Sequence, residues 1–243
     1  DTKRAYMAFQ QFLHKIFPKV YSEEDFVKKT HHALVELGFS ADNSIVSVCI
    51  CRDEISQPFM TLVKDTWGDA FNLSSLGGMF FAGQTGLIAA MQHAPDKDGR
   101  ERYIYFALPH IAMDMDGRLG VCRRKGKEEE SNACGALGSF QKELAAGKLH
   151  LSMDEADPEQ SLLKRRLLRE IFYGHVPDLL ELTKIAQKVV QKDLEHAVNT
   201  IINRSKSDYA MLSGIQIHGP EGNYVWPGTC YAVVRDLMQE IEL

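Results

Sequence analysis

Three residues of the kinds that bind zinc stand at the ends of predicted elements in the middle of the chain. They are Cys51, His110 and Cys134. Zinc prefers thiolate and imidazole ligands, and a catalytic zinc site has three protein ligands with a fourth position open to water. No pair of these residues forms a Cys-x-x-Cys or His-x-x-x-His motif. Spacing alone therefore also allows three buried residues with structural roles.

Two predicted strands would position the first two of these residues. The run 43–50 is short and rich in β-branched residues, which predicts a strand buried on both faces, and Cys51 follows it. A second predicted strand, 102–108, ends just before His110. Ligands bind at the carboxyl ends of strands in open α/β sheets. Cys49 points to the same face as Cys51 but lies deeper in the strand, so we expect it to be a core thiol.

A predicted helix would position Cys134. The segment 131–144 has small residues through its first turns, and Ser131 or Asn132 is the expected N-cap. Cys134 would then lie in the first helical turn. The helix dipole and the free N–H groups there lower the pKa of a thiol and favour the thiolate that binds metal.

Several further segments predict elements around these strands. Helical periodicity, capping residues and prolines mark predicted helices at 4–17, 22–37, 57–67, 158–172 and 179–202, with a final acidic helix from about residue 236. Period-two patterns predict strand structure at 209–218, a turn followed by strand character at 219–227, and one more strand at 229–234. The mixture predicts an α/β protein with a central, mostly parallel sheet flanked by helices and with helical additions at both termini.

Two loops raise other possibilities for chemistry. Leu76–Gly86 is rich in glycine and leads into a helix, so its N–H groups could hold a small anion, or its glycines could allow close packing of helix on sheet. It lacks the Gly-Lys-Ser/Thr ending of a phosphate-binding P-loop. Met113–Arg118 predicts a turn with Asp-Gly at its tip. The alternative, a calcium-binding loop, is excluded because the segment lacks the further oxygen ligands that such a loop requires.

The composition limits the function classes. The 243 residues carry a formal net charge of −5, with 44% hydrophobic and 25% charged residues, which is typical of one globular domain and argues against a nucleic-acid-binding surface. No apolar stretch is long enough to span a bilayer. Five cysteines, an odd number, favour free thiols or metal ligands over a disulfide framework.

Four motifs in the middle of the chain resemble one known family. They are Val48–Ile55, Leu76–Gly86, Pro109–Ile111 and Ser131–Ala136. In this order and with these residues, the chain resembles the limiting-CO2-inducible B/C proteins of algae, the theta-type carbonic anhydrases related to the beta class. The resemblance implies a fold like that of beta carbonic anhydrases, as a single zinc-binding domain over residues 1–243. We expect N-terminal helices at 1–40, the zinc-site core at 41–150, a helical segment at 151–205 and C-terminal strands and a helix at 206–243.

The resemblance also implies a reaction and a set of site residues. Zn2+ held by Cys51, His110 and Cys134 would catalyse the reversible hydration of carbon dioxide to bicarbonate through a zinc-bound hydroxide, which would make the protein a lyase. Asp53 matches the carboxylate that, in beta-type enzymes, contacts the zinc-bound water or displaces it. The beta pattern Cys-x-Asp-x-Arg is only half met, because position 55 is Ile. We expect Arg52 to be the catalytic partner of Asp53, with Arg118 and Arg123 as alternatives.

Further expectations depend on the same resemblance. Met79–Phe81 would suit a dry pocket for carbon dioxide or simply pack in the core, and His93 or His218 would be a proton shuttle or a surface residue. The resemblance implies a homodimer or a hetero-oligomer with a paralogue, with residues 158–202 as a candidate contact. It places the protein in the chloroplast, in a carbon-concentrating mechanism, and any targeting segment would lie outside this chain. The alternative is an inactive zinc-binding relative that acts as a scaffold or bicarbonate-binding subunit.

Overall fold

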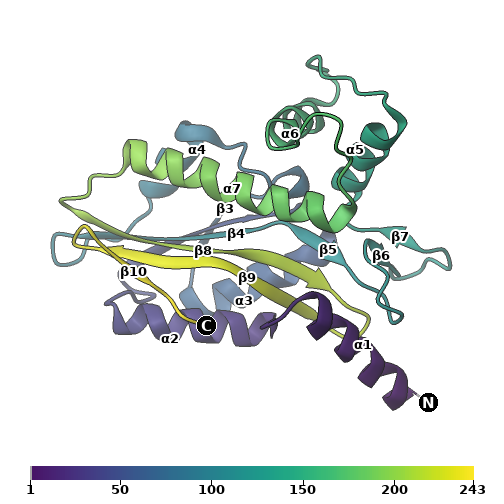
Figure 1. Ribbon diagram of the computed structural model, residues 1–243. Coiled ribbons are helices and arrows are strands. Elements are labelled where there is room, and N and C mark those ends of the chain that lie inside the picture. The colour runs from purple at the N-terminus through teal and green to yellow at the C-terminus, as the bar shows by residue number, and fades with distance from the viewer. Residues whose placement is uncertain (1) are drawn as a thin grey trace.

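A mixed β-sheet forms the centre of the computed structural model, which describes residues 2–243 and the side chains from Tyr6 onward (Figure 1). The strand order is β1-β9-β8-β4-β2-β3, with β5 beside β8 and β10 beside β9. These strands are β1 (Tyr21–Ser22), β2 (Ser44–Ile50), β3 (Ala70–Asn72), β4 (Glu101–Leu108), β5 (His110–Ala112), β8 (Ser207–His218), β9 (Asn223–Val234) and β10 (Leu237–Glu240). A separate small hairpin pairs β6 (Val121–Cys122) with β7 (Ser131–Asn132).

The middle of the sheet is parallel. β3, β2, β4 and β8 pair in parallel, and β5 continues this arrangement against β8. β9 then pairs antiparallel with β8, β1 and β10. The predicted central, mostly parallel sheet flanked by helices is confirmed, and its parallel strands end at the same edge.

Helices cover both faces of the sheet. They are α1 (Thr2–Ile16), α2 (Glu23–Glu36), α3 (Gln57–Trp67), α4 (Gly83–Met91), α5 (Gly135–Ala146), α6 (Pro158–Leu168) and α7 (Leu179–Ile201). In Figure 1, α2 and α3 lie on one face, and α4 and α7 lie on the other. Helices α5 and α6 pack against the N-terminal part of α7, and the β6–β7 hairpin lies past the end of β5. Within residues 2–243, no helix combines the length and apolar character that a membrane crossing requires.

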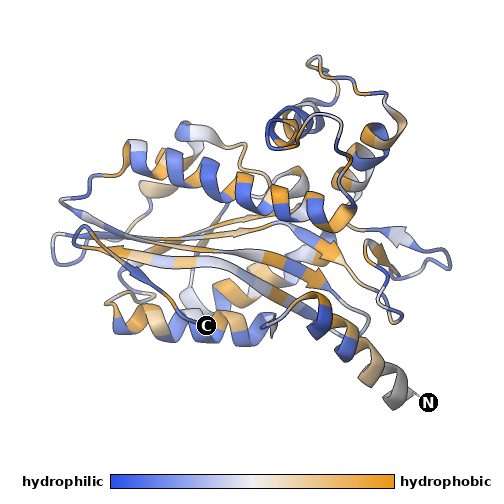
Figure 2. Ribbon diagram, in the orientation of Figure 1, coloured by the Kyte–Doolittle hydropathy of each residue, from blue (hydrophilic) through white to orange (hydrophobic). Residues whose placement is uncertain are grey.

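The apolar side chains of β2 explain why this strand is buried on both faces. Val46, Val48 and Ile50 belong to the core under α2 and α3. Ile45 and Cys49 belong to the core under α4 and α7. Figure 2 shows the matching pattern on the helices, whose hydrophobic residues face the sheet. Cys49 is a core thiol as predicted, and burial raises its pKa to about 12.

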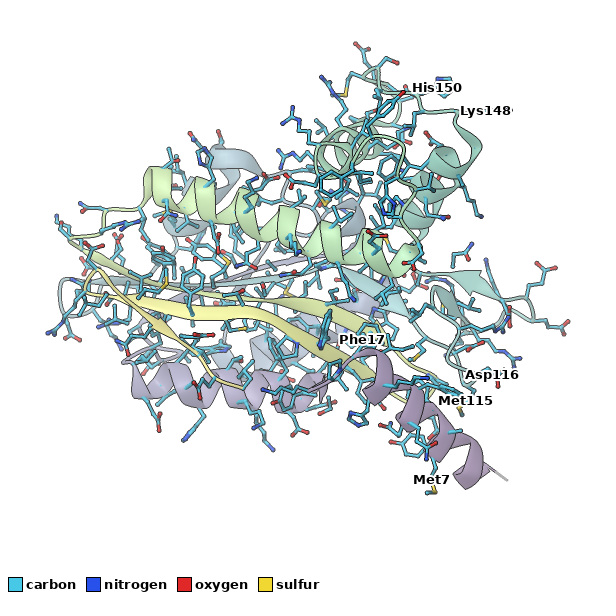
Figure 3. All side chains as sticks on the ribbon, in the orientation of Figure 1. Met7, Phe17, Met115, Asp116, Lys148 and His150 are labelled. Atoms are coloured by element: carbon cyan, nitrogen blue, oxygen red, sulfur yellow. The ribbon has the colours of Figure 1, made fainter. Side chains whose placement is uncertain are left out.

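Helix α1 packs on the sheet through only part of its length. Phe9, Leu13 and Phe17 are fully buried against Ile217 and its neighbours. Figure 3 shows Phe17 against the sheet and Met7 at the outer end of the helix. Met7 is 57% exposed, so α1 leaves an apolar side chain in solvent.

The expected C-terminal helix is wrong, because the chain ends in a hairpin. Arg235 and Asp236 have φ values of 50° and 66°, which suits a two-residue hairpin turn and prevents a helix from starting there. β10 therefore pairs antiparallel with β9. β9 is also one long strand, because a register shift opposite Leu212–Gly214 accommodates Pro227 within it.

The glycine-rich loop supports the packing interpretation. Gly77 and Gly78 have φ values of 67° and 71°. A Cβ on Gly78 would lie 3.0 Å from Cα of Pro109, and one on Gly77 would lie 2.7 Å from a methyl group of Leu163. The backbone N–H of Leu76 donates to the carboxylate of Glu159 on α6 at 2.9 Å. This N–H group is therefore already bonded to a carboxylate of the chain itself.

Candidate metal centre

Cys51, His110 and Cys134 come together at the carboxyl edge of the sheet. One possible ligand atom from each lies within 4.8 Å of the others, and the two Sγ atoms are 4.0 Å apart. Cys51 follows β2, His110 opens β5, and Cys134 precedes α5. All three side chains are buried, with His110 at 0% exposure. The structure therefore groups the residues that the sequence analysis selected as ligands.

Cys134 occupies the N-cap of α5 rather than its first turn. Its backbone is extended, with φ −81° and ψ 130°, and its carbonyl accepts the first helical hydrogen bond from Gly138. The expected caps Ser131 and Asn132 instead form β7, which pairs with β6. The N–H groups of Ala136 and Leu137 favour the thiolate form of Cys134, as expected at a helix start.

The pKa values of the two thiols shift in opposite directions. A hydrogen bond from Cys134, followed by His110, lowers the pKa of Cys51. Cys51 and burial raise the pKa of Cys134. Two thiolates this close and this buried repel each other, so a bound cation is what would allow both to ionise.

His110 supplies an independent test of whether a metal fits. Its Nδ1 and Nε2 atoms are buried and have no hydrogen-bond partner among the described residues. Burying polar atoms without a partner is costly, and a metal would satisfy one of them. Two sulfurs and one imidazole nitrogen are a donor set that suits zinc. The residues present therefore fit a zinc ion.

A cavity of about 560 Å3 opens onto the two cysteines. Its lining combines acidic groups with a larger number of basic ones: Cys51, Arg52, Asp53, Glu54, Leu76, Arg124, Lys125, Lys127, Cys134, Gly135 and Ala136. Water and small anions can therefore reach the sulfurs from this side. On the inner side, Met79 is fully buried and packs with both cysteines in one apolar cluster, whereas Phe80 belongs to the core under α7.

Asp53 stands at the cavity wall and is held by Arg124. The guanidinium donates two parallel hydrogen bonds to the carboxylate, Nη1 to Oδ1 and Nη2 to Oδ2, both at 2.8 Å. Nε2 of His110 lies 4.0 Å from Oδ2 of Asp53. Burial alone would raise the pKa of Asp53, but the hydrogen bonds from Arg124, together with the other polar and charged groups around it, hold this pKa well below its usual range. Asp53 is therefore an ionised carboxylate beside the three candidate ligands.

The arginine beside Asp53 differs from the expected ones. Arg52 points the other way and donates to Glu159 at 2.5 Å, and Arg118 pairs with Asp114 at 2.6 Å. Arg124 reaches Asp53 because the β6–β7 hairpin folds back toward the cysteines, and its Nη2 also donates to the carbonyl of Asn132 at 3.3 Å. In the sequence, Arg124 is recognisable only as one of several basic residues in the segment before Cys134.

The two histidines considered as proton shuttles lie in different places. His93 follows α4 and contacts Phe71, with ring centroids 5.9 Å apart. His218 is buried rather than on the surface, and its ring centroid lies 5.1 Å from that of His110. Nδ1 of His218 is 2.9 Å from Asn223 Oδ1, and burial lowers its pKa to about 3. It is therefore a neutral imidazole behind the site.

The fold and the site define an α/β protein with a candidate metal centre formed by two thiols and one imidazole. The family model described as limiting CO2-inducible proteins B/C beta carbonic anhydrases matches residues 20–234. The chain belongs to this family, as its four motifs predicted. A comparison with curated proteins gave no significant match.

Solved structures agree with this assignment. The crystal structure of limiting CO2-inducible protein LCIB is 31% identical, with a TM-score of 0.80 over 95% of this chain and 97% of that one. The structure of PtLCIB4, a homolog of LCIB, is 20% identical, with a TM-score of 0.82 over 96% of this chain and 100% of that one. A PtLCIB4 mutant with one histidine replaced by alanine is 21% identical, with a TM-score of 0.79 over 97% and 99%. The PtLCIB4 structures support the fold.

Proposed function

We propose that this protein is a zinc-dependent carbonic anhydrase, a lyase that interconverts carbon dioxide and bicarbonate. The observation that carries the proposal is the convergence of Cys51, His110 and Cys134 beside a carboxylate that Arg124 holds in place. Membership of a family described as beta carbonic anhydrases supports it. Zinc held by these residues would lower the pKa of a water molecule to about 7, so that it can attack carbon dioxide near neutral pH.

Asp53 would orient the attacking water in this proposal. Arg124 binds both of its oxygens, which fixes the orientation of the carboxylate beside the three candidate ligands. Oδ1 also accepts a hydrogen bond from the N–H of Ile55 at 3.4 Å, so Oδ2 is the oxygen that keeps a second acceptor site. Asp53 can therefore accept a hydrogen bond from a water molecule at the fourth position and orient its lone pair toward the substrate.

The surroundings suit an uncharged substrate and an anionic product. Leu76, Ala136 and the methylene groups of the two cysteines give the cavity an apolar part, where carbon dioxide loses little by leaving water. Arg52, Lys125 and Lys127 lie on the outer wall, where positive charge attracts bicarbonate as it leaves. The cavity also lets buffer molecules approach to remove the proton that hydration releases.

Stopped-flow hydration of carbon dioxide together with zinc analysis tests the proposal. The expected result is about one zinc per chain and a rate that Cys51→Ala and Asp53→Ala abolish, with zinc lost only in Cys51→Ala. Less than about half a zinc per chain would contradict the metal assignment. If the wild type binds about one zinc per chain but hydrates carbon dioxide no faster than the variants do, the protein is instead an inactive relative, a zinc-binding scaffold or bicarbonate-binding subunit.

The proposal extends to assembly and location. As the family resemblance implies, we propose that the protein acts in the chloroplast, in a carbon-concentrating mechanism, as a homodimer or as a hetero-oligomer with a paralogue. The helices from Pro158 to Ile201 are one candidate contact, since Phe172 and Tyr173 between them are 83% and 108% exposed. Light scattering of the purified protein and imaging of a fluorescent fusion of the whole gene product test these points.

A further inference from the structure

Two buried polar side chains with unpartnered atoms lie on neighbouring strands. Strands β5 and β8 lie side by side (Figure 1), and His110 and Gln216 are register partners on them. The N–H of Gln216 donates to the carbonyl of Pro109 at 2.9 Å. Both side chains are 0% exposed. Within the part of the chain that the structure describes, Oε1 of Gln216 and both ring nitrogens of His110 have no hydrogen-bond partner. Register partners present their side chains on the same face of a sheet, so the unused acceptor of Gln216 and the unpartnered imidazole lie on one face of neighbouring strands.

Glu23 fixes the direction in which the Gln216 amide points. Nε2 of Gln216 donates to Oε1 of Glu23 at 2.8 Å. Glu23 opens α2 and is only 2% exposed, so water does not compete for this contact. An amide has a donor at one end and an acceptor at the other, and the carboxyl group takes the donor end. Oε1 is therefore the end of Gln216 that remains free for another partner.

The ring nitrogens of His110 can be told apart by their neighbours. Nε2 lies 4.0 Å from Oδ2 of Asp53 and so faces the candidate metal centre. The oxygens of Asp53 are already held by Arg124, which leaves this carboxylate poorly placed to orient the imidazole. Nδ1 is then the nitrogen that needs an acceptor at the back of the site. A metal-binding histidine almost always donates its second N–H to such an acceptor, which fixes its tautomer and makes it a better ligand.

We propose that Gln216 is a positioning residue for the metal centre, whose Oε1 accepts a hydrogen bond from Nδ1–H of His110 when Nε2 binds the metal. Glu23 acts through Gln216 by holding the amide in the required orientation. This inference rests on the zinc site of the proposed function. It adds a buried chain of contacts from the first turn of α2, through β8, to the histidine ligand.

Zinc affinity tests this role directly. Competition with a chromogenic chelator would give the zinc dissociation constants of the wild type, Gln216→Leu and Gln216→Met. Both variants keep the size of the side chain and remove the acceptor, so we expect zinc to bind 10- to 100-fold more weakly. Gln187→Leu is the matched control. The side-chain amide of Gln187, on α7, donates to Oγ of Ser213 at 2.8 Å, and Gln187 does not line the cavity of the site. The control should bind zinc as the wild type does.

Nuclear magnetic resonance of histidine-labelled, zinc-loaded protein gives a second readout. In the wild type, Nδ1–H of His110 should exchange slowly with solvent because it is buried and hydrogen-bonded. In Gln216→Met the same proton should exchange faster or shift strongly. Wild-type zinc affinity and a protected Nδ1–H in both Gln216 variants would overturn the inference while leaving the zinc site intact. Absence of zinc from the wild type would instead contradict the proposed function.

Discussion

One feature of the candidate metal centre is the arginine that binds the carboxylate of Asp53. Arg124 grips both oxygens of Asp53, and it comes from the β6–β7 hairpin, not from the segment around Asp53. Position 55, where the beta pattern has arginine, is Ile. A planar guanidinium can reach a carboxylate from either direction as long as its two parallel hydrogen bonds form. The same pairing can thus be built from a different part of the chain.

Removing Arg124 should reduce carbon dioxide hydration and leave zinc bound. Without its partner, Asp53 is free to turn toward the fourth ligand position, so we expect Arg124→Ala to lower kcat/KM by about 100-fold. Arg124→Lys keeps the charge without the two parallel bonds and should recover only part of the loss. Stopped-flow assays and zinc analysis measure both effects.

Arg204→Ala is the matched control for this prediction. Arg204 forms an exposed ion pair with Asp236 at 3.1 Å and does not line the cavity, so its loss should leave the rate unchanged. If Arg124→Ala retains half or more of the wild-type rate, Arg124 has no role in the reaction.

Glu23 should make stability depend on pH. Burial, partly offset by hydrogen bonds from Gln216 and Asn223 and reinforced by the nearby Glu24, raises its pKa from 4.5 to about 7. The unfolded chain therefore loses this proton first, and stability falls as pH rises from about 4.5 to 7, by up to about 3 kcal/mol. Glu23→Gln carries no charge, so it should be more stable than the wild type at pH 8 and similar at pH 4.5.

Urea unfolding at pH 4.5, 6 and 8 measures this difference. Glu24→Gln removes a carboxylate from the same helical turn at an exposed position, and it should follow the wild-type profile. The measurement uses zinc-free protein, because Glu23 also contacts Gln216 and its substitution could change zinc binding. The pKa assignment is wrong if the Glu23 and Glu24 variants show the same pH dependence.

At the scale of elements, the joint between β4 and β5 positions the histidine ligand. Pro109 separates the two strands and His110 follows it directly. The loop of Gly77 and Gly78 packs against this joint so closely that a Cβ on Gly78 would lie 3.0 Å from Cα of Pro109 and 3.3 Å from the carbonyl of Leu108. The glycines thus place the backbone of His110 rather than bind an anion.

Gly78→Ala should therefore disturb both stability and zinc binding. The new methyl group needs a left-handed backbone and pushes against Pro109, so we expect a loss of about 2 kcal/mol in the free energy of unfolding and weaker zinc binding. Gly83→Ala is the control, because its φ is +63° and nothing lies within 4 Å of its Cβ. Gly83→Ala should lose stability only through its left-handed backbone, without a clash, and should keep the zinc affinity of the wild type. Equal zinc affinities in the two variants would contradict this role for the loop.

Elements with strong local patterns could be predicted from the sequence, and those set by long-range contacts could not. Two predicted features depend only on residues that are close together in the sequence. They are the β-branched run of β2 and the capping box of α2, where Ser22 accepts from the N–H of Asp25 at 3.1 Å. The C-terminal segment from Asp236 has helix-like composition, but the positive φ values at Arg235 and Asp236 turn it back along β9. Pairing with an existing strand edge outweighs such local preference.

The site shows the same division between local and long-range information. Cys51, His110 and Cys134 were found because each marks the end of an element and matches a family motif. Arg124 and Gln216 were missed, since each acts through a contact set by strand pairing: the β6–β7 hairpin for one and the β5–β8 register for the other. Residues that position others have no motif of their own in a single sequence.

At the scale of the whole molecule, the candidate metal centre joins three parts of the fold. Cys51 extends from the sheet core, His110 from the joint of β4 and β5, and Cys134 from α5, which packs with α6 and α7 beyond the sheet edge. An ion pair between Arg52, which follows Cys51, and Glu159 on α6 also joins these parts, but the arginine is 62% exposed and the pair contributes little. A shared metal would therefore couple this layer to the sheet.

Removing zinc should consequently lower thermal stability as well as activity. A ligand that binds only the folded state at about 100 times its Kd stabilises it by about 2.7 kcal/mol, which for a chain of this size corresponds to about 5 to 10 °C in Tm. We expect the Tm of the wild type to fall by this amount with a chelator and to recover when zinc is added back. Cys51→Ala should lack the shift. Cys49→Ala should keep it at a lower Tm, because this equally buried thiol hydrogen-bonds only to the carbonyls of Gly78 and Met79. A chelator-induced shift of equal size in both cysteine variants would show that the metal binds elsewhere on the chain.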